Sequence, residues 1–152
     1  PDLSNVVAIA AGANHNLALR RDHTVAAWGY NHLGQSDVPP GLSNVVAIAA
    51  GWEHNLALTA GGCLIAWGDN EYGQTAIPIG LSKAVAVAAG DLHSLAVTTE
   101  GHVVAWGWNP YGRRSVPPMV RAMTSPQAPP PASRLRMRRS SLSREHCAGY
   151  LS

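Results

Sequence analysis

Three histidines recur at a fixed interval and are the first residues to consider for chemistry. His15, His54 and His93 lie 39 residues apart, and imidazole nitrogens are common zinc ligands. Nitrogens that share a tetrahedral zinc ion lie roughly 3.4 Å apart, so histidines on successive units would have to meet very close to a common axis. A position followed by apolar residues that pack inward does not reach that axis. We therefore expect each imidazole to bond to the backbone of a neighbouring unit, and we expect no metal site.

Few other residues suggest catalysis. The sequence has no G-x-S-x-G, no phosphate-binding glycine loop, no H-E-x-x-H and no C-x-x-C. The acidic pair Asp69 and Glu71 has no neighbouring base or nucleophile, which is typical of a solvated rim. We therefore predict no enzyme activity, no cofactor and no small-molecule substrate.

The histidines belong to a repeat that organises most of the chain. The segment NVVAIAAGANHNLALRRDHTVAAW returns as NVVAIAAGWEHNLALTAGGCLIAW and again as AVAVAAGDLHSLAVTTEGHVVAW. A constant period identifies a repeat architecture. Residues 1–39, 40–78 and 79–117 are therefore three copies of one unit, and residues 118–152 are a different segment. The repeated positions with a structural role are Gly12, Gly51, Gly90, His15, His54, His93, Trp28, Trp67 and Trp106.

Each unit is predicted to form a series of short strands. Residues 6–11 are a continuous apolar run whose length suits a strand buried on both faces. Residues 15–19 and 24–28 supply two more strands, and a short extended segment ending at Pro39 supplies a fourth at an edge. About four short strands per unit correspond to one blade of a propeller. The second and third strands are expected to join through two-residue hairpin loops with positive φ, at Asp22-His23, Gly61-Gly62 and Glu100-Gly101.

Small and large residues indicate where each strand lies. Ala8, Ala10 and Ala11 leave little side-chain volume on the first strand, so we expect this strand near the crowded axis of a radial array. The tryptophans of the three units are expected further out, between blades. Their identical placement in every unit favours core packing over a ligand cage.

One motif runs through residues 1–117. It reads G-x-x-H-x-L-A-L, then G-x-x-x-A-W-G-x-N-x-x-G-Q, then V-P, and it resembles the repeat of the regulator-of-chromosome-condensation family. The third copy departs from the pattern at Arg113, where the family has Gln. The matching residues of the first copy are Gly12, His15, Leu17, Ala18, Leu19, Trp28, Gly29, Asn31, Gly34, Gln35 and Pro39.

The resemblance implies a seven-bladed propeller, and the compact spacing is similar to bacterial members, including the propeller type that inhibits β-lactamases. The name-giving member implies guanine-nucleotide exchange on a small GTPase, but this chain lacks family-specific loop insertions. Three units cannot close a seven-bladed ring. The chain is therefore a fragment of a longer parent, a subunit of an assembly or a truncated product. Two open blade faces predict self-association.

Two clusters of residues vary between the near-identical units. One cluster follows the repeated glycine, and the other follows the repeated tryptophan. Loops often carry binding surfaces, and Tyr and Trp are enriched at protein interfaces; the alternative is drift at exposed positions without a partner. We predict a protein-binding surface made of Tyr30, His32, Trp52, Glu53, Asp69, Glu71, Tyr72, Asp91, Trp108 and Tyr111.

Charge separates the repeats from the rest of the chain. Residues 1–117 hold five Lys or Arg and eight Asp or Glu, a net charge of −3, whereas residues 118–152 hold six Arg and one acid, a net charge of +5. The Pro-, Arg- and Ser-rich composition of residues 118–152 predicts a disordered tail. Such a tail would contact nucleic acid or acidic lipid only weakly, and a degenerated reading frame explains the same composition.

Together these patterns predict an all-β partial propeller of about three four-stranded blades, followed by the disordered tail. No apolar run approaches the length of a membrane span. The predicted function is a non-enzymatic scaffold that binds a partner protein through its variable aromatic loops.

Overall fold

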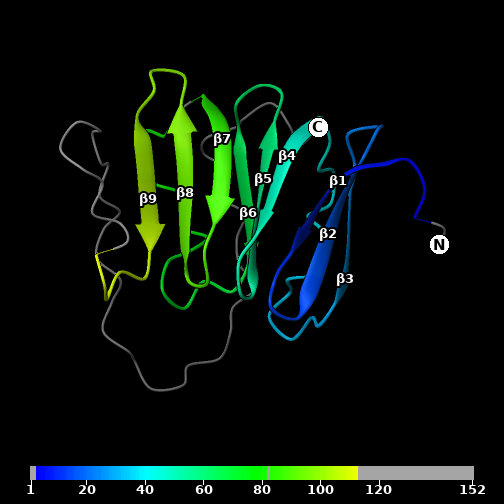
Figure 1. The fold of residues 1–152 in the computed structure, drawn as a ribbon, viewed down its shortest axis with the longest axis horizontal. Coiled ribbons are helices and arrows are strands. Elements are labelled where there is room, and N and C mark those ends of the chain that lie inside the picture. Colours follow the sequence, from blue (N-terminus) through cyan, green and yellow to red (C-terminus); the bar gives the residue numbers. More distant parts are fainter. Residues whose placement is uncertain (1–2, 82, 113–152) are drawn as a thin grey trace.

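The computed structural model describes residues 3–81 and 83–112. They form three antiparallel sheets of three strands, one sheet per unit (Figure 1). The described part contains no helix, and so none that could span a bilayer. The predicted all-β repeat architecture is confirmed, and the predicted tail, residues 118–152, lies outside the described residues. The strands are β1 (Val6–Ala11), β2 (His15–Arg20), β3 (Val25–Gly29), β4 (Val45–Ala50), β5 (His54–Thr59), β6 (Leu64–Gly68), β7 (Ala84–Ala89), β8 (His93–Thr98) and β9 (Val103–Gly107).

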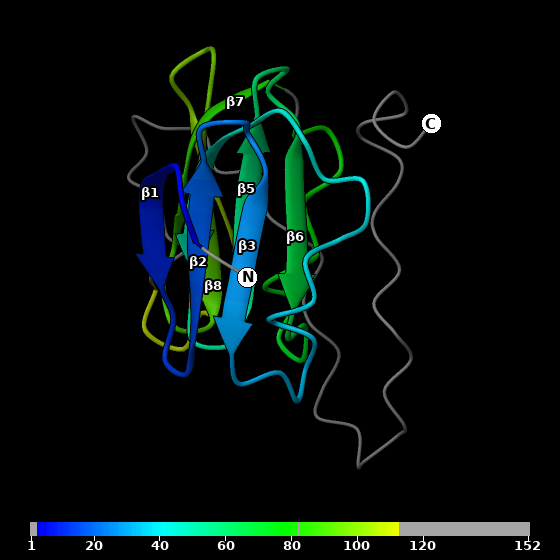
Figure 2. The same ribbon diagram turned by 90° about the vertical axis from the view of Figure 1, so that its right-hand side faces the viewer.

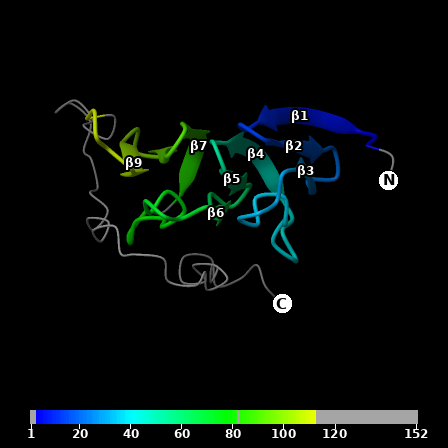
Figure 3. The same cartoon turned by 90° about the horizontal axis from the view of Figure 1, so that it is seen from below.

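The three sheets follow one another along an arc, as blades do (Figure 3). The first strands, β1, β4 and β7, run along one side of the arc (Figure 3). Figure 2 shows the sheet β1-β2-β3 in front of the sheet that contains β5 and β6. Side chains from facing sheets form two apolar clusters. The first is built on Leu17, Leu19, Val25, Val45, Ala57 and Trp67, and the second on Leu56, Leu58, Leu64, Leu81, Ala84, Ala96, Val104 and Trp106.

The first strand of each unit is more exposed than the sequence predicted. The prediction that residues 6–11 are buried on both faces is wrong, because no residue of β1 is fully buried and Ile9 is 78% exposed. Each first strand is the edge of its sheet and has a neighbouring strand on one side only. A register shift at the start of each strand accompanies a solvent-exposed valine. These exposed residues are Val7, Val46 and Val85.

The hairpin between the second and third strands has three loop residues, not two. In the first unit, residues 21–23 form the loop, and the His23 N–H donates to the Arg20 carbonyl at 3.0 Å. Only the last loop residue has positive φ, 64° at His23 and 80° and 79° at the equivalent glycines. This geometry is a type I turn followed by a left-handed residue, which matches the twist of a hairpin. The His23 ring also bonds through Nδ1 to the Val45 carbonyl at 3.0 Å, which helps to hold the unfavourable backbone conformation.

The fourth strand predicted for each unit is absent from the described residues. In the first unit, residues 30–39 form turns and loop. Pro39 and Pro40 have no N–H to donate to a ladder. The loop instead satisfies its polar groups internally: the Ser36 N–H donates to Asn31 Oδ1 at 2.8 Å. Within the described residues each unit is therefore a three-stranded sheet, and in the first two units an outer loop follows it.

Candidate protein-binding face

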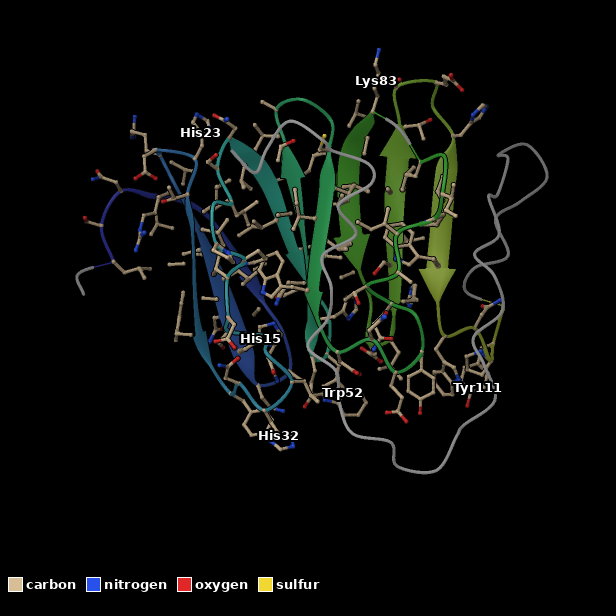
Figure 4. All side chains as sticks on the ribbon, turned by 180° about the vertical axis from the view of Figure 1, so that it is seen from behind. His15, His23, His32, Trp52, Lys83 and Tyr111 are labelled. Carbon is tan, nitrogen blue, oxygen red and sulfur yellow. The ribbon has the colours of Figure 1, made fainter. Side chains whose placement is uncertain are left out.

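Both variable clusters of a unit lie at the same end of its sheet. One follows the first strand and the other follows the third, and these two strands run in the same direction because each is antiparallel to the strand between them. Figure 4 shows His32, Trp52 and Tyr111 at this end and His23 and Lys83 at the opposite end. We call the surface formed by the ten predicted binding residues the loop face.

Backbone hydrogen bonds connect the two clusters within each unit. The Tyr30 N–H donates to the Asn14 carbonyl at 2.8 Å, and the Asp69 N–H donates to the Glu53 carbonyl at 2.8 Å. The same bond recurs in the third unit. The clusters that sequence variation singled out separately are thus one structural element per unit.

Further backbone bonds join the loop face from unit to unit. The Ala13 N–H donates to the Trp52 carbonyl at 3.2 Å, and the Trp52 N–H donates to the Asp91 carbonyl at 3.0 Å. Residues of the first cluster therefore form a continuous row across three sheets. The variable side chains project from this shared backbone frame.

The Asn and Gln of the repeated motif shape the second cluster. In the second unit, Asn70 Oδ1 accepts from the Thr75 N–H at 3.0 Å, and Gln74 Oε1 accepts from the Tyr72 N–H at 2.9 Å. The Gln74 amide also donates to the Asp69 carboxylate at 2.8 Å. Gln74 is fully buried, so these bonds hold the loop in one conformation.

Aromatic side chains from two units meet on the loop face. The ring centroids of Tyr72 and Trp108 lie 5.4 Å apart, and those of Trp108 and Tyr111 lie 6.4 Å apart in an edge-on arrangement. Both distances suit favourable aromatic contact. In the first unit, Tyr30 and His32 form a further pair at 6.1 Å. Trp108 and Tyr111 remain exposed, as do Trp52 and Tyr30, so the rings present apolar area to solvent.

A hollow of about 370 Å³ lies where the first strands end. Trp52 and Asp91 belong to its wall. Apart from Asp91, the lining is apolar or glycine and supplies no nucleophile, base or cation. The hollow therefore offers shape and one carboxylate rather than a catalytic arrangement. Its lining is Ala11, Gly12, Ala13, Ala50, Gly51, Trp52, Ala89, Gly90 and Asp91.

Charge is distributed unequally between the two ends of the sheets. The loop face carries four carboxylates, those of Glu53, Asp69, Glu71 and Asp91. The Lys and Arg residues of the described ranges lie outside it: Arg20 and Arg21 adjoin the opposite turn, where Figure 4 also shows Lys83. The loop face is therefore both aromatic and acidic.

The first two repeated histidines lie between neighbouring sheets and contact a side chain rather than the predicted backbone group. His15 Nε2 lies 2.7 Å from Asn55 Oδ1, and the Asn55 amide donates to the Gln35 carbonyl at 2.8 Å. In the next pair of units, His54 Nε2 lies 3.0 Å from Ser94 Oγ. Because the Asn55 amide nitrogen is the donor to Gln35, its oxygen accepts from His15, which requires a proton on Nε2. The sequence signal for this contact is that the residue after each histidine is polar.

Burial keeps His54 neutral. Loss of solvation, together with the nearby His93 and His15 imidazoles, lowers the pKa of His54 to about 4. Within the described ranges, no group of three or more His, Cys, Asp or Glu side chains is arranged to hold a metal ion. The geometry gives the first two histidines of the trio a role in joining sheets.

Two of the three repeated tryptophans also join sheets. Trp67 Nε1 donates to the Gln35 carbonyl at 3.2 Å, and Trp106 Nε1 donates to the Gln74 carbonyl at 2.9 Å. One buried glutamine carbonyl per junction therefore accepts from both an indole and a hydroxyl or amide of the next unit. The sequence placed the tryptophans between blades but did not indicate that the motif glutamine receives them.

The same motif defines the family of the chain. The family profile described as "Regulator of chromosome condensation (RCC1) repeat" matches residues 6–35, 45–74 and 84–113, more than half of the sequence. The chain belongs to the RCC1 repeat family. Each match begins at the start of a first strand and ends at the motif glutamine position, so the RCC1 repeat includes both the sheet and the loop that ties it to the next sheet. A search of curated proteins found no match.

Solved propeller structures share the fold. Human WBSCR16 aligns with a TM-score of 0.64 and 26% identity, over 72% of this chain and 35% of that protein. Prp20p from Saccharomyces cerevisiae, whose structure was reported with its binding properties to Gsp1p and histones, aligns with a TM-score of 0.63 and 26% identity over 78% and 34%. The ectodomain of the Physcomitrella patens receptor kinase CR4 aligns with a TM-score of 0.62 and 24% identity over 74% and 33%. The chain thus spans about a third of the length of these proteins.

Proposed function

We propose that the chain is a non-enzymatic scaffold whose loop face binds a partner protein that presents a basic surface. The observation that carries this proposal is the convergence of variable aromatic and acidic residues on one face. Trp108 links Tyr72 of the second unit to Tyr111 of its own unit. A surface assembled from several repeats suits a macromolecule better than a small ligand.

Rigidity supports a binding role. Buried glutamines hold the second-cluster loops of the first two units, and backbone bonds of the first cluster cross from unit to unit. A preorganised surface loses little conformational freedom when it binds. Tyr and Trp add large contact areas with few rotatable bonds, as in other protein-binding loops.

Electrostatics supports the basic character of the partner. Four carboxylates share the loop face, and a complementary positive surface would accelerate association and oppose acidic competitors. Histones, which appear among the proteins tested with the relative Prp20p, are a suitable basic probe.

Interferometry on the immobilised full chain, with purified histones as the probe, tests this function. We expect the substitutions Trp52→Ala and Tyr111→Ala each to weaken binding at least about tenfold, the size of a strong interface contact. Ile79→Ala, which truncates an exposed apolar residue outside the loop face, is the matched control and should bind as the wild type does.

A second pair of variants tests the contribution of charge. Glu53→Gln should slow association and reduce its salt dependence, whereas Glu100→Gln, in the turn at the opposite end, should have no effect. Histone binding that is unaffected by all the loop-face variants, or an absence of binding by the wild type, would contradict the proposal.

A further inference from the structure

The sheet β1-β2-β3 exposes a face that its counterparts bury. Trp28 is 42% exposed, whereas its equivalents Trp67 and Trp106 are 4% and 0% exposed. Leu3 is 42% exposed, whereas its equivalent Leu81 is 5% exposed. Because the chemistry of these positions is the same, the difference comes from the sheet that packs on the second and third units. We call the surface of Leu3, Ile9 and Trp28 the leading face.

The sheet β7-β8-β9 exposes its other face, the one that packs against the following sheet in the first two units. Leu95, Val97 and Val103 are only partly buried, although all their equivalents in the first two units are buried. A Cβ on Gly62 would contact Lys83 of the following unit, but a Cβ on Gly101 would meet nothing within 4 Å. We call the surface of Leu95, Val97 and Val103 the trailing face.

These two faces are complementary because the chain already joins the same pair of surfaces twice. At both internal junctions, the leucines of one sheet pack against the tryptophan and small residues of the next. At both junctions the carbonyl of the last turn residue accepts from the backbone of the next unit: His23 from the Val45 N–H at 3.1 Å, and Gly62 from the Ala84 N–H at 3.0 Å. If a second copy packed on the sheet β7-β8-β9, the Gly101 carbonyl would accept in place of the Gly62 carbonyl. The Val6 N–H of the second copy would donate in place of the Ala84 N–H.

We propose that this chain pairs with a second copy of itself, head to tail, so that the trailing face of one copy covers the leading face of the other. Each face would then contact the kind of surface that it already contacts at the two internal junctions of the chain. Such a junction is heterologous, and repetition of it yields a ring or an open chain of subunits.

The number of copies follows from the number of units. The family resemblance implies a ring of seven blades. Two copies supply six units, and the one position that remains is too small for a third copy with its three units. The expected assembly is therefore a dimer. The dimer concerns surfaces other than the loop face, so it stands or falls independently of the proposed binding function.

Sedimentation and light scattering of the full 152-residue chain test this inference. We expect a species of about twice the 16.0 kDa of one chain. Ile9→Glu on the leading face and Val97→Glu on the trailing face should each give monomers. An equimolar mixture of the two variants should form a dimer again, because one intact leading face and one intact trailing face remain.

The control is Val85→Glu, which places the same charge at an exposed valine whose equivalents are exposed in all three units. It should remain dimeric. A dimer formed by either single-face variant alone would show that like faces pair and would overturn the head-to-tail arrangement. A monomeric wild type, a mixture that stays monomeric or assembly beyond a dimer would also contradict the proposal.

Tryptophan fluorescence provides a test that requires no charged substitution. Dilution of the wild type should shift emission to longer wavelength as Trp28 returns to solvent, and Trp28→Phe should abolish that shift. If the shift persists in Trp28→Phe, the leading face is not at the junction.

Discussion

At the scale of single residues, Gln35 and Gln74 each make two kinds of contact from one position. The side-chain oxygen of each accepts a loop N–H, and the main-chain carbonyl accepts donors from the next unit. The two glutamines differ in one contact: Gln74 donates to Asp69, but Gln35 Nε2 is buried without a hydrogen-bond partner. The residue equivalent to Asp69 in the first unit is Tyr30, which has no carboxylate.

This difference predicts the effect of Tyr30→Asp. A carboxylate at this position would accept from Gln35 Nε2 as Asp69 does from Gln74, and satisfying a buried donor contributes about 1 to 3 kcal/mol. We therefore expect the free energy of unfolding in urea to increase by about that amount. Tyr30→Asn is the isosteric control and should recover less of the gain, because its oxygen carries no charge. A loss of stability in Tyr30→Asp would show that the tyrosine ring is worth more than the bond.

Protonation of His54 predicts a dependence of stability on pH. Its folded-state pKa of about 4 lies below the ordinary value of 6.5. Between these values the unfolded chain binds a proton that the folded chain does not, so the free energy of unfolding falls as pH falls from 6.5 to 4. A shift of this size corresponds to about 3 kcal/mol. Urea unfolding at pH 7, 5.5 and 4.5 should show the loss, and His54→Gln should reduce the slope, whereas exposed His32→Gln should not.

At the scale of the elements, each sheet is joined to the next by a polar layer and an apolar layer. The polar layer contains the histidine of one sheet, the polar residue that follows the histidine of the next sheet, and the main-chain carbonyl of the motif glutamine. The apolar layer contains the leucines of one sheet and the tryptophan of the next. Neighbouring sheets contact each other through whole faces. A substitution on such a face should therefore lower the free energy of unfolding only where another sheet packs against it.

The pair Trp106→Phe and Trp28→Phe tests this conclusion. Trp106 is buried and donates to the Gln74 carbonyl, so we expect its replacement to lower the free energy of unfolding by about 1 to 3 kcal/mol. Trp28 occupies the same position on an exposed face, and its replacement in the monomeric Ile9→Glu background should cost less than about 0.5 kcal/mol. Equal losses for the two would mean that the indoles act within their own sheets.

At the scale of the whole molecule, stability is distributed along the array. All six residues of β5 are buried, because sheets cover it on both sides, whereas β8 has partly buried residues. Repeat proteins gain stability from each neighbouring interface. The central sheet has two such interfaces, and each outer sheet has one within the chain.

Amide hydrogen exchange should therefore be slowest in β5. In monomeric Ile9→Glu we expect protection to decrease from β5 to β2 and β8, because outer sheets open without breaking both junctions. In the proposed dimer, protection in β2 and β8 should approach that of β5. Uniform protection in the monomer would instead indicate that the three sheets unfold as one cooperative unit.

The sequence by itself determined the repeat, its period, the all-β class and the three main strands of each unit. These features depend on local patterns that recur along the three units, such as the apolar run of residues 6–11 and the turn glycines. Sequence variation between the units also selected the residues of the loop face. Their function as a binding site remains a prediction.

Only the tertiary structure decided how the units contact one another. The partner of His15 is Asn55, 40 residues away, and no local pattern shows which group of the next unit an imidazole reaches. The exposure of Ile9 and Trp28, and the absence of a fourth strand from the described part of each unit, likewise depend on what packs against each sheet. Residues with identical local sequence can be buried or exposed because burial belongs to the junction between sheets, not to the segment that contributes to it.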